Sequence, residues 1–245
     1  MEKKLISHRG YKQGFLENSR AALEKALKEG LSFETDIRTT NDGVPFLIHD
    51  DTIDRLLNGS GLIAAYYADE LELFMYKEDK SQKLVSLDEF CKIVKELYKN
   101  GLIFIHIKEL DAVEPSMKIF QEYGFEDRLR FFAVDKIALK FVHLMKEKYP
   151  KYKVGLYLPE NSPDFTDDKM KMADFIWADE ITFKWIDKKK VDLAHELGKP
   201  FYAISPELIP KSIFNKNIEE RWKELLDDGV DAICTGKPGD YLKFI

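Results

Sequence analysis

Cysteine is almost absent from this chain of 245 residues, which contains only Cys91 and Cys234. The two lie far apart and no CxxC pattern occurs, so we expect neither a disulfide framework nor a cysteine-bound zinc cluster. Histidine is also scarce, with only five residues. If several of these five gather at the ends of strands, they become candidates for chemistry.

The chain also lacks a surplus of positive charge and any long apolar run. Lysine and arginine total 38 against 44 acidic residues, a formal net charge of −6, so we expect no nucleic-acid partner. The apolar run that follows Met1 is too short for a signal peptide, and no later run is long enough to span a membrane. We therefore expect a cytoplasmic protein without stable membrane anchoring. The sequence leaves its oligomeric state open.

What the chain does contain is a regular alternation of short β-rich runs and amphipathic helical stretches. Apolar residues recur at three- and four-residue spacing in the helical stretches. Strands are predicted at Lys4–Ser7, Leu31–Ile37, Leu102–Ile107, Leu129–Ala133, Lys153–Leu158, Asp174–Ala178, Phe201–Ile204 and Asp231–Cys234. Helices are predicted at Ser19–Glu29, Leu87–Lys99, Glu114–Tyr123, Lys136–Lys148, Lys188–Leu197 and Ile218–Asp227.

Eight strands that alternate with helices predict an α/β protein with a TIM (β/α)₈ barrel, a fold of ~250 residues. A doubly wound open sheet gives much the same local pattern, so the alternation favours the barrel without excluding the open sheet. One segment interrupts the alternation. Asn41-Asp42-Gly43 is a hairpin signal after the second strand, and Val44–Ile48 is its return run. We interpret residues 1–245 as one barrel domain with a small insertion after the second strand, at about residues 51–84, that lies near one end of the barrel.

Several polar side chains end or follow the first strands and the hairpin. They are His8 and Arg9 after the first strand, Glu34 and Asp36 on the second, His49 and Asp50 after the hairpin, and His106 and Lys108 on the third. Side chains two apart in a strand share a face. The C-terminal ends of the strands in a parallel barrel converge at one end of the molecule, where active sites are found. We therefore expect these side chains to meet in one pocket.

The residue types in this pocket indicate metal-assisted phosphoester hydrolysis. Two carboxylates buried side by side are costly without a cation, and oxygen-rich pairs favour Mg²⁺ or Ca²⁺. Arg9 and Lys108 supply the positive charge that a phosphate needs. Two histidines can divide proton removal from water and proton delivery to a leaving alkoxide between them.

The same residues carry a resemblance to a known family. The motifs are Ile6-Ser7-His8-Arg9-Gly10, Glu17-Asn18-Ser19, Phe33-Glu34-Thr35-Asp36-Ile37-Arg38, Asn41-Asp42-Gly43, His49-Asp50, Arg55, Ser86–Phe90 and Gly229–Thr235. Because these motifs occur together at this spacing, the chain resembles the glycerophosphodiester phosphodiesterase family over essentially its whole length. The resemblance implies a TIM barrel with an insertion after the second strand. It also implies hydrolysis of a small-molecule glycerophosphodiester to glycerol 3-phosphate and an alcohol, assisted by a divalent cation.

The resemblance also assigns roles to residues. It implies that His8 and His49 are the general acid/base pair, Arg9 a phosphate contact, Glu34 and Asp36 metal ligands, and Lys108 the basic residue of the third-strand motif. For Glu17 we expect a pocket role toward the substrate or the metal, whereas Asn18 or Ser19 caps the following helix. Asp50 either orients His49, pairs with Arg9 or is purely structural. His143 and His195 fall inside helical patterns and are expected to be structural.

The chain departs from the family at the third strand. The family usually has Glu-Ile-Lys there, and this chain has His106-Ile107-Lys108. His106 as the third metal ligand shifts preference toward Mn²⁺ or Zn²⁺. The alternatives are that Glu109 or a water fills the position, or that the metal site is weakened. Two other functions stay open: a phospholipase-D-like hydrolase of lysophospholipids, and a non-catalytic phosphate-ligand binder on the same barrel.

Overall fold

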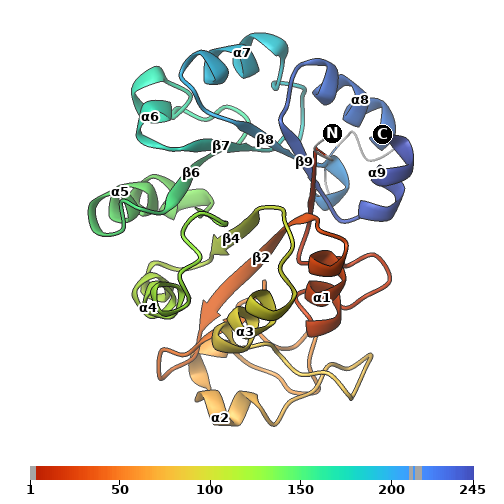
Figure 1. Cartoon of the computed structure of the whole chain (residues 1–245), viewed down its shortest axis with the longest axis vertical. Helices are drawn as coiled ribbons and strands as arrows, with labels where there is room; N and C mark the ends of the chain where they lie inside the picture. Colours follow the sequence, from red (N-terminus) through yellow and green to blue (C-terminus); the bar gives the residue numbers. More distant parts are fainter. Residues whose placement is uncertain (1–3, 210–211, 213–216) are drawn as a thin grey trace.

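Strand β1 (Leu5–Ser7) pairs with β2 (Ser32–Thr39) on one side and with β9 (Ala232–Thr235) on the other, and this double pairing closes the sheet. The computed structural model describes residues 4–209, 212 and 217–245 (Figure 1). The first three residues, on which the expectation about the start of the chain partly rests, lie outside the described residues.

The remaining parallel strands follow one another around the barrel in chain order. They are β4 (Ile103–Ile107), β5 (Leu129–Phe132), β6 (Lys153–Leu158), β7 (Phe175–Ala178) and β8 (Phe201–Ile204). The hairpin strand β3 (Pro45–Leu47) pairs antiparallel with β2. Closure through β1 decides between the barrel and the open sheet. The predicted TIM barrel is therefore confirmed, and the predicted strands match the observed ones to within two residues at each end.

The helices surround the barrel. Those that the periodicity predicts are α1 (Arg20–Lys28), α3 (Leu87–Leu97), α4 (Val113–Tyr123), α5 (Ala138–Lys148), α7 (Lys188–Glu196) and α8 (Ile218–Asp227). Those that it misses are α2 (Ala68–Leu71), α6 (Asp167–Met172) and α9 (Pro238–Phe244). The missed helices span one or two turns, which is too short for a three- and four-residue pattern to repeat. The shorter 3₁₀ turns are η1 (Ile63–Ala65), η2 (Leu110–Ala112), η3 (Asp135–Ile137) and η4 (Pro206–Leu208).

The core has two layers, because side chains alternate between the two faces of each strand. Phe33, Ile103 and Ile105 face outward and pack under the helices. Phe104 faces the barrel interior, where its ring meets the ring of Trp177 at a centroid distance of 5.2 Å and that of Tyr202 at 5.0 Å. Full burial of one such side chain stabilises the fold by roughly 1.5–3 kcal/mol. Packed rings thus fill the barrel and form a floor beneath its polar end.

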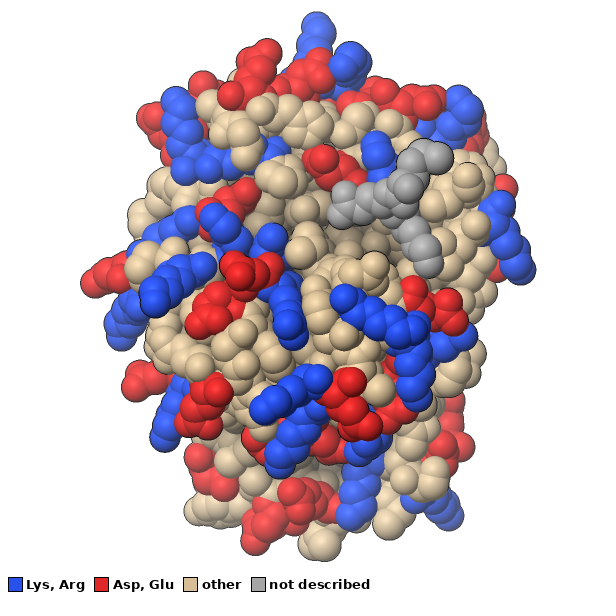
Figure 2. Space-filling model, in the orientation of Figure 1, with Lys and Arg blue, Asp and Glu red and all other residues tan. Residues whose placement is uncertain are grey.

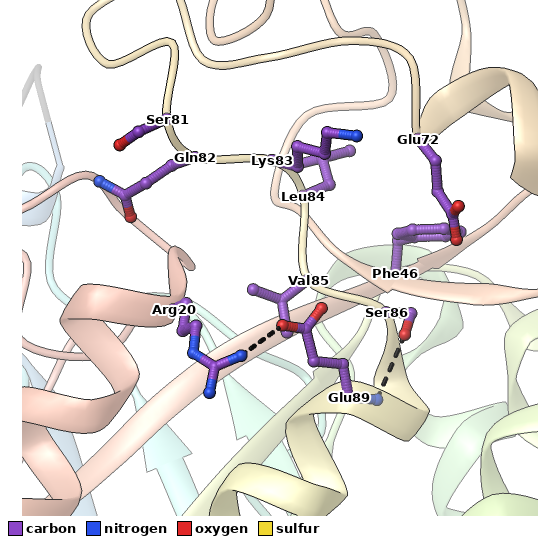
Figure 3. Close-up of a pocket in the computed structure, with 10 residues that line it drawn as sticks. All are labelled: Arg20, Phe46, Glu72, Ser81, Gln82, Lys83, Leu84, Val85, Ser86 and Glu89. Atoms are coloured by element: carbon purple, nitrogen blue, oxygen red, sulfur yellow. Dashed lines mark hydrogen bonds and ion pairs between the residues drawn. The ribbon is translucent and has the colours of Figure 1, made fainter.

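The segment between β3 and α3 builds a small apolar cluster of its own, which contains Ile53, Leu57 and Tyr76. Its helix α2 lies at one end of the molecule in Figure 1. Figure 3 shows a pocket where the segment joins the barrel, lined by residues of the segment together with Arg20 of α1 and Glu89 of α3. There the Ser86 hydroxyl accepts a hydrogen bond from the backbone N–H of Glu89 and caps α3. The Glu89 carboxylate pairs with Arg20 of α1 at 3.1 Å. Arg20 and Glu89 thus link α1 and α3 at this pocket.

Charges of both signs are interspersed over the face shown in Figure 2. In the part of the chain that the structure describes, none of the helices combines the length and the apolar character that a membrane crossing requires.

Candidate active site

The pleat of β2 and β4 places three polar side chains inside the barrel. In the parallel register of these strands Glu34 lies opposite Phe104, and Asp36 lies opposite His106. Since Phe104 faces the interior, so do the other three residues of these two pairs. Glu34, Asp36 and His106 are all buried. The strand geometry therefore brings two carboxylates and an imidazole together, as their positions in the sequence predict.

These three side chains form a candidate metal site. His106 Nδ1 lies 3.1 Å from Asp36 Oδ1 and 3.9 Å from Glu34 Oε1. One ligating atom from each residue lies within 4.8 Å of the others. Glu34 Oε1 is buried and has no hydrogen-bond partner among the described residues. A buried carboxylate oxygen without a partner, beside a second carboxylate and an imidazole, fits a divalent cation.

The two carboxylates differ in their affinity for protons. Burial and the negative charge of Asp36 raise the pKa of Glu34 well above its ordinary value. Burial also acts to raise the pKa of Asp36, but the contact with His106 and the charges of Arg9 and Lys108 hold it well below its ordinary value. The second negative charge is therefore costly here, and a divalent cation relieves this cost.

The two predicted phosphate contacts flank the candidate metal site. Arg9 Nε lies 3.3 Å from Asp36 Oδ2, and Lys108 Nζ lies 3.5 Å from Asp36 Oδ1. Arg9 has a φ of 56°, in the left-handed region that side chains rarely adopt, and its backbone N–H donates to Glu34. Gly10 follows with a φ of 73°, and a Cβ there would lie 3.0 Å from the backbone of Ala22. The tight turn after β1 thus directs Arg9 and its N–H toward the acidic pair.

The two candidate proton-transfer residues, His8 and His49, line the same cavity. Burial, together with the positive charges of Arg9 and Lys12, holds the pKa of His8 well below its ordinary value. Burial also lowers the pKa of His49, and the positive charges of Arg9 and Lys108 add to this effect, whereas the negative charge of Asp36 and the hydrogen bond with Asp50 oppose it. Asp50 Oδ1 lies 2.7 Å from His49 Nδ1. Of the three roles open to Asp50, the structure shows the orienting contact with His49.

Glu17 is held by two arginines. Arg9 Nη1 donates to Glu17 Oε1 at 2.8 Å, and Arg55 donates to both carboxylate oxygens of Glu17. Arg55 also donates to Asp50. Burial acts to raise the pKa of Asp50, but the hydrogen bonds from Arg55 and His49 lower it to about 2. A continuous set of charged contacts thus runs from His49 through Asp50, Arg55 and Glu17 to Arg9.

Two residues near the site have contacts that the sequence did not predict. Asn18 donates from Nδ2 to Asp36 Oδ2 at 3.1 Å and accepts a hydrogen bond from Thr35, so it positions Asp36 rather than capping α1. Ser19 caps that helix. The positive charge of Lys12 helps to lower the pKa of His8. Asn18 stands in a recognised motif, and that signal could have revealed it. Lys12 lies in the loop after β1, away from a strand end, and carries no comparable signal.

Glu109 was an alternative third metal ligand. Its carboxylate accepts hydrogen bonds from Arg38 at 2.7 Å and from the backbone N–H of Thr39 at 2.9 Å. The structure therefore groups His106, and not Glu109, with Glu34 and Asp36. Of the remaining histidines, His143 is exposed on α5. His195 of α7 forms a hydrogen bond of 2.8 Å between its Nε2 and Asp231 Oδ2. Neither of these lines the cavity.

The cavity that contains these groups has a volume of about 1020 Å³. It is lined by residues that end or follow parallel strands, where a TIM barrel carries its active site. The fold and this cavity define a TIM-barrel protein with an acidic and imidazole-rich candidate active site that carries two adjacent cationic side chains.

Comparison with known proteins identifies the family. The model of the glycerophosphoryl diester phosphodiesterase family matches residues 8–240. The chain therefore belongs to this family and is an enzyme of the phosphodiesterase class. It is 28% identical to a glycerophosphodiester phosphodiesterase of Caldanaerobacter subterraneus subsp. tengcongensis, over 100% of this chain and 98% of that protein. It is 25% identical to a glycerophosphodiester phosphodiesterase of Bacillus altitudinis, over 98% of this chain and 97% of the relative.

Solved structures share the fold. An Oleispira antarctica phosphodiesterase, solved in complex with the product sn-glycerol-3-phosphate, matches with a TM-score of 0.80 and 20% identity. That match covers 98% of this chain and 95% of the other. A putative glycerophosphodiester phosphodiesterase from Galdieria sulphuraria matches with a TM-score of 0.78 and 21% identity, over 98% of this chain and 96% of the other.

Proposed function

We propose that this enzyme hydrolyses glycerophosphodiesters to glycerol 3-phosphate and an alcohol, with the assistance of a divalent cation. One observation carries the proposal: the ligating atoms of Glu34, Asp36 and His106 lie within 4.8 Å of one another in a cavity that His8 and His49 also line. The family match, and the glycerol 3-phosphate bound to the Oleispira protein, support this choice of substrate. A cytoplasmic location stays a prediction of the sequence.

Glu34, Asp36 and His106 are the residues that would hold the cation. When bound, the cation polarises the phosphate and stabilises the negative charge that grows on its oxygens. The two carboxylates favour Mg²⁺ or Ca²⁺, and the imidazole of His106 extends the choice to Mn²⁺ or Zn²⁺. Asn18 and Arg9 keep Asp36 in position through contacts of 3.1 Å and 3.3 Å to its Oδ2.

The cationic side chains and the histidines divide the remaining work. Arg9 and Lys108 bind the phosphoryl oxygens and stabilise their charge in the transition state. The pKa of His8 is held well below its ordinary value, so His8 is neutral near pH 7 and accepts a proton as general base. Burial lowers the pKa of His49, but the hydrogen bond with Asp50 opposes this and favours the protonated form, from which His49 donates a proton to the leaving alkoxide.

The direct test is the release of glycerol 3-phosphate from glycerophosphodiesters with different alcohols. The protein is first treated with EDTA, and Mg²⁺, Ca²⁺, Mn²⁺ or Zn²⁺ is then added back separately. We expect no release after EDTA and recovery with at least one cation. No release with any cation would leave a non-catalytic binder of phosphate ligands. Release of the alcohol from a long-chain lysolipid, with none from a deacylated diester, would assign the phospholipase-D-like activity instead.

A further inference from the structure

The candidate catalytic groups occupy only one end of the cavity. They come from β2 and β4 and from the segments that follow β1, β3 and β4. The opposite end is built by β5, β6 and β7 and the residues after them, and includes Phe132, Tyr157, Trp177 and Asp179. We call these four residues the distal subsite. The proposed reaction uses none of them, yet they line the same cavity of about 1020 Å³.

Asp179 is the unusual member of the distal subsite. It directly follows β7, lines the cavity and is only 6% exposed. Its Oδ2 accepts a hydrogen bond of 2.5 Å from the Tyr157 hydroxyl, but its Oδ1 has no hydrogen-bond partner among the described residues. Burial, reinforced by the negative charges of Glu160 and Asp135, raises the pKa of Asp179 to about 6. A carboxylate in such a place is costly unless a cation accompanies it.

The next residue, Glu180, is also a buried carboxylate, but it is paired with a cation of the protein. Arg221 of α8 donates to both carboxylate oxygens of Glu180 at 2.8 Å. Asp179, by contrast, forms no ion pair with any lysine or arginine in the described part of the chain. Two adjacent buried carboxylates are thus treated differently, and the one without a protein cation is the one that lines the cavity.

An aromatic wall connects the candidate metal site to Asp179. The ring of Phe132 stacks on the ring of His106 at a centroid distance of 4.7 Å. It also stacks on the ring of Trp177, at a centroid distance of 4.3 Å. Trp177 lies opposite Tyr157 in the β6–β7 register and precedes Asp179 by two residues. Aromatic rings beside a carboxylate attract ammonium groups, above all quaternary ones, through the negative charge on the ring faces.

The charge of the cavity therefore changes along its length. Arg9 and Lys108 line the catalytic end and attract an anion there. The distal end is lined by Asp135, Asp164 and Asp179 together with one lysine, Lys136, and Asp179 attracts a cation there. We propose that the distal subsite binds the ammonium group of an amino-alcohol leaving group, with Asp179 as its counter-ion, so that the enzyme prefers zwitterionic diesters. This inference rests on the proposed function, because the catalytic end must hold the phosphate.

The test compares two diesters that differ only in charge. One is glycerophosphocholine, and the other is the 3,3-dimethylbutyl ester of glycerol 3-phosphate, in which carbon replaces the quaternary nitrogen. We expect the wild type to show a kcat/KM at least tenfold higher for the charged ester, and Asp179→Asn to abolish most of this preference. Asp164→Asn is the matched control. Asp164 also lines the cavity, but it pairs with Lys169, so this variant keeps the preference.

Each other outcome overturns the inference. An equal loss on both esters in Asp179→Asn means that Asp179 contacts the glycerol or only supports the fold. If Asp179→Asn does not fold, as judged by its circular dichroism and melting curve, the wild type decides alone: no preference between the esters overturns the proposal.

Failure of the proposed function has a different signature, in which the wild type cleaves neither ester with any cation. The subsite is then tested by calorimetric titration of both esters into the wild type. Binding of glycerophosphocholine at least tenfold tighter than that of its neutral analogue supports the subsite, and equal binding overturns it.

Discussion

Asp50 holds the ring of His49 through its Nδ1, at 2.7 Å from Asp50 Oδ1. The same carboxylate is held from the other side by Arg55. This contact with His49 leaves Nε2 as the nitrogen for the proposed proton transfer, and the hydrogen bond with Asp50 favours the protonated ring. Asp50 is thus the residue through which the pH dependence of His49 can be changed without removing the imidazole.

Asp50→Asn is expected to shift one limb of the pH–rate profile. Because Asp50 raises the pKa of His49, its neutralisation lowers that pKa, so His49 loses its proton at lower pH. If His49 is the general acid, the alkaline limb of kcat/KM moves to lower pH and the acid limb stays in place. The profile is measured with a saturating cation, and Asp51→Asn, an exposed neighbour, is the control. Movement of the acid limb instead would assign His49 as the base.

Removal of either candidate catalytic imidazole is expected to reduce turnover strongly. His8→Ala and His49→Ala should each lower kcat by roughly 10²–10⁴-fold, the usual contribution of a general acid or base. His143→Ala changes an exposed histidine of α5 and serves as the control, with kcat unchanged. Steady-state release of glycerol 3-phosphate measures the effect. Near wild-type kcat in both variants contradicts the assignment of the pair.

His106 is expected to determine the preferred cation. His106→Glu replaces an imidazole with a third carboxylate, so the affinity for Mg²⁺ and Ca²⁺ should rise relative to that for Mn²⁺ and Zn²⁺ by roughly tenfold or more. Calorimetric titration measures these affinities without reference to activity. His106→Ala is the companion variant and should bind all four cations more weakly. Unchanged affinities in both variants mean that His106 is not a ligand.

Cation binding is also expected to stabilise the fold. A cation at one hundred times its dissociation constant should raise the free energy of unfolding by about 2.7 kcal/mol, because it binds the folded state. Asp36→Asn removes one candidate ligand and should abolish this gain, whereas Asp42→Asn, in the hairpin turn, should retain it. Urea unfolding with cation and with EDTA measures the difference. An equal gain in wild type and Asp36→Asn places the cation elsewhere.

The buried pair Glu180–Arg221 is expected to be a large stability determinant. Glu180→Gln leaves the buried Arg221 guanidinium with only the partly exposed Glu224 as a charged partner and should cost about 3–5 kcal/mol in the free energy of unfolding. The double variant Glu180→Gln/Arg221→Met should cost less, because it leaves no unpaired charge. Lys223→Ala removes an exposed pair with Asp227 on the same helix and should cost less than about 1 kcal/mol. A small effect of Glu180→Gln would show that solvent reaches the pair.

The alternation of strands and helices predicts the barrel well, because each strand and each long helix leaves a local pattern. The same holds for the polar residues at strand ends: a two-residue spacing puts Glu34 and Asp36 on one face, and the parallel register then brings His106 beside Asp36. These relations follow from periodicity. They need no knowledge of how the connecting segments fold.

Contacts between segments distant in the chain could not be predicted in this way. Arg55 reaches Glu17 across 38 residues of sequence, and Arg38 binds Glu109 across 71. Such pairs depend on the path of the loops, which carries no period. Asp179 is a different case, because it follows a predicted strand as directly as His8 follows the first. Its signal was present in the sequence, but its missing counter-ion is visible only in three dimensions.

The closure of the sheet determines when the site around His8 can form during protein synthesis. In the pairing of β1 with β9, Leu5 lies opposite Ile233 and Ser7 lies opposite Thr235. The His8 backbone N–H then donates to the carbonyl of Thr235. The site around His8 therefore cannot be complete until residue 235 has left the ribosome. We therefore expect a chain that ends before β9 to leave β1 unpaired on one side and His8 without this backbone contact.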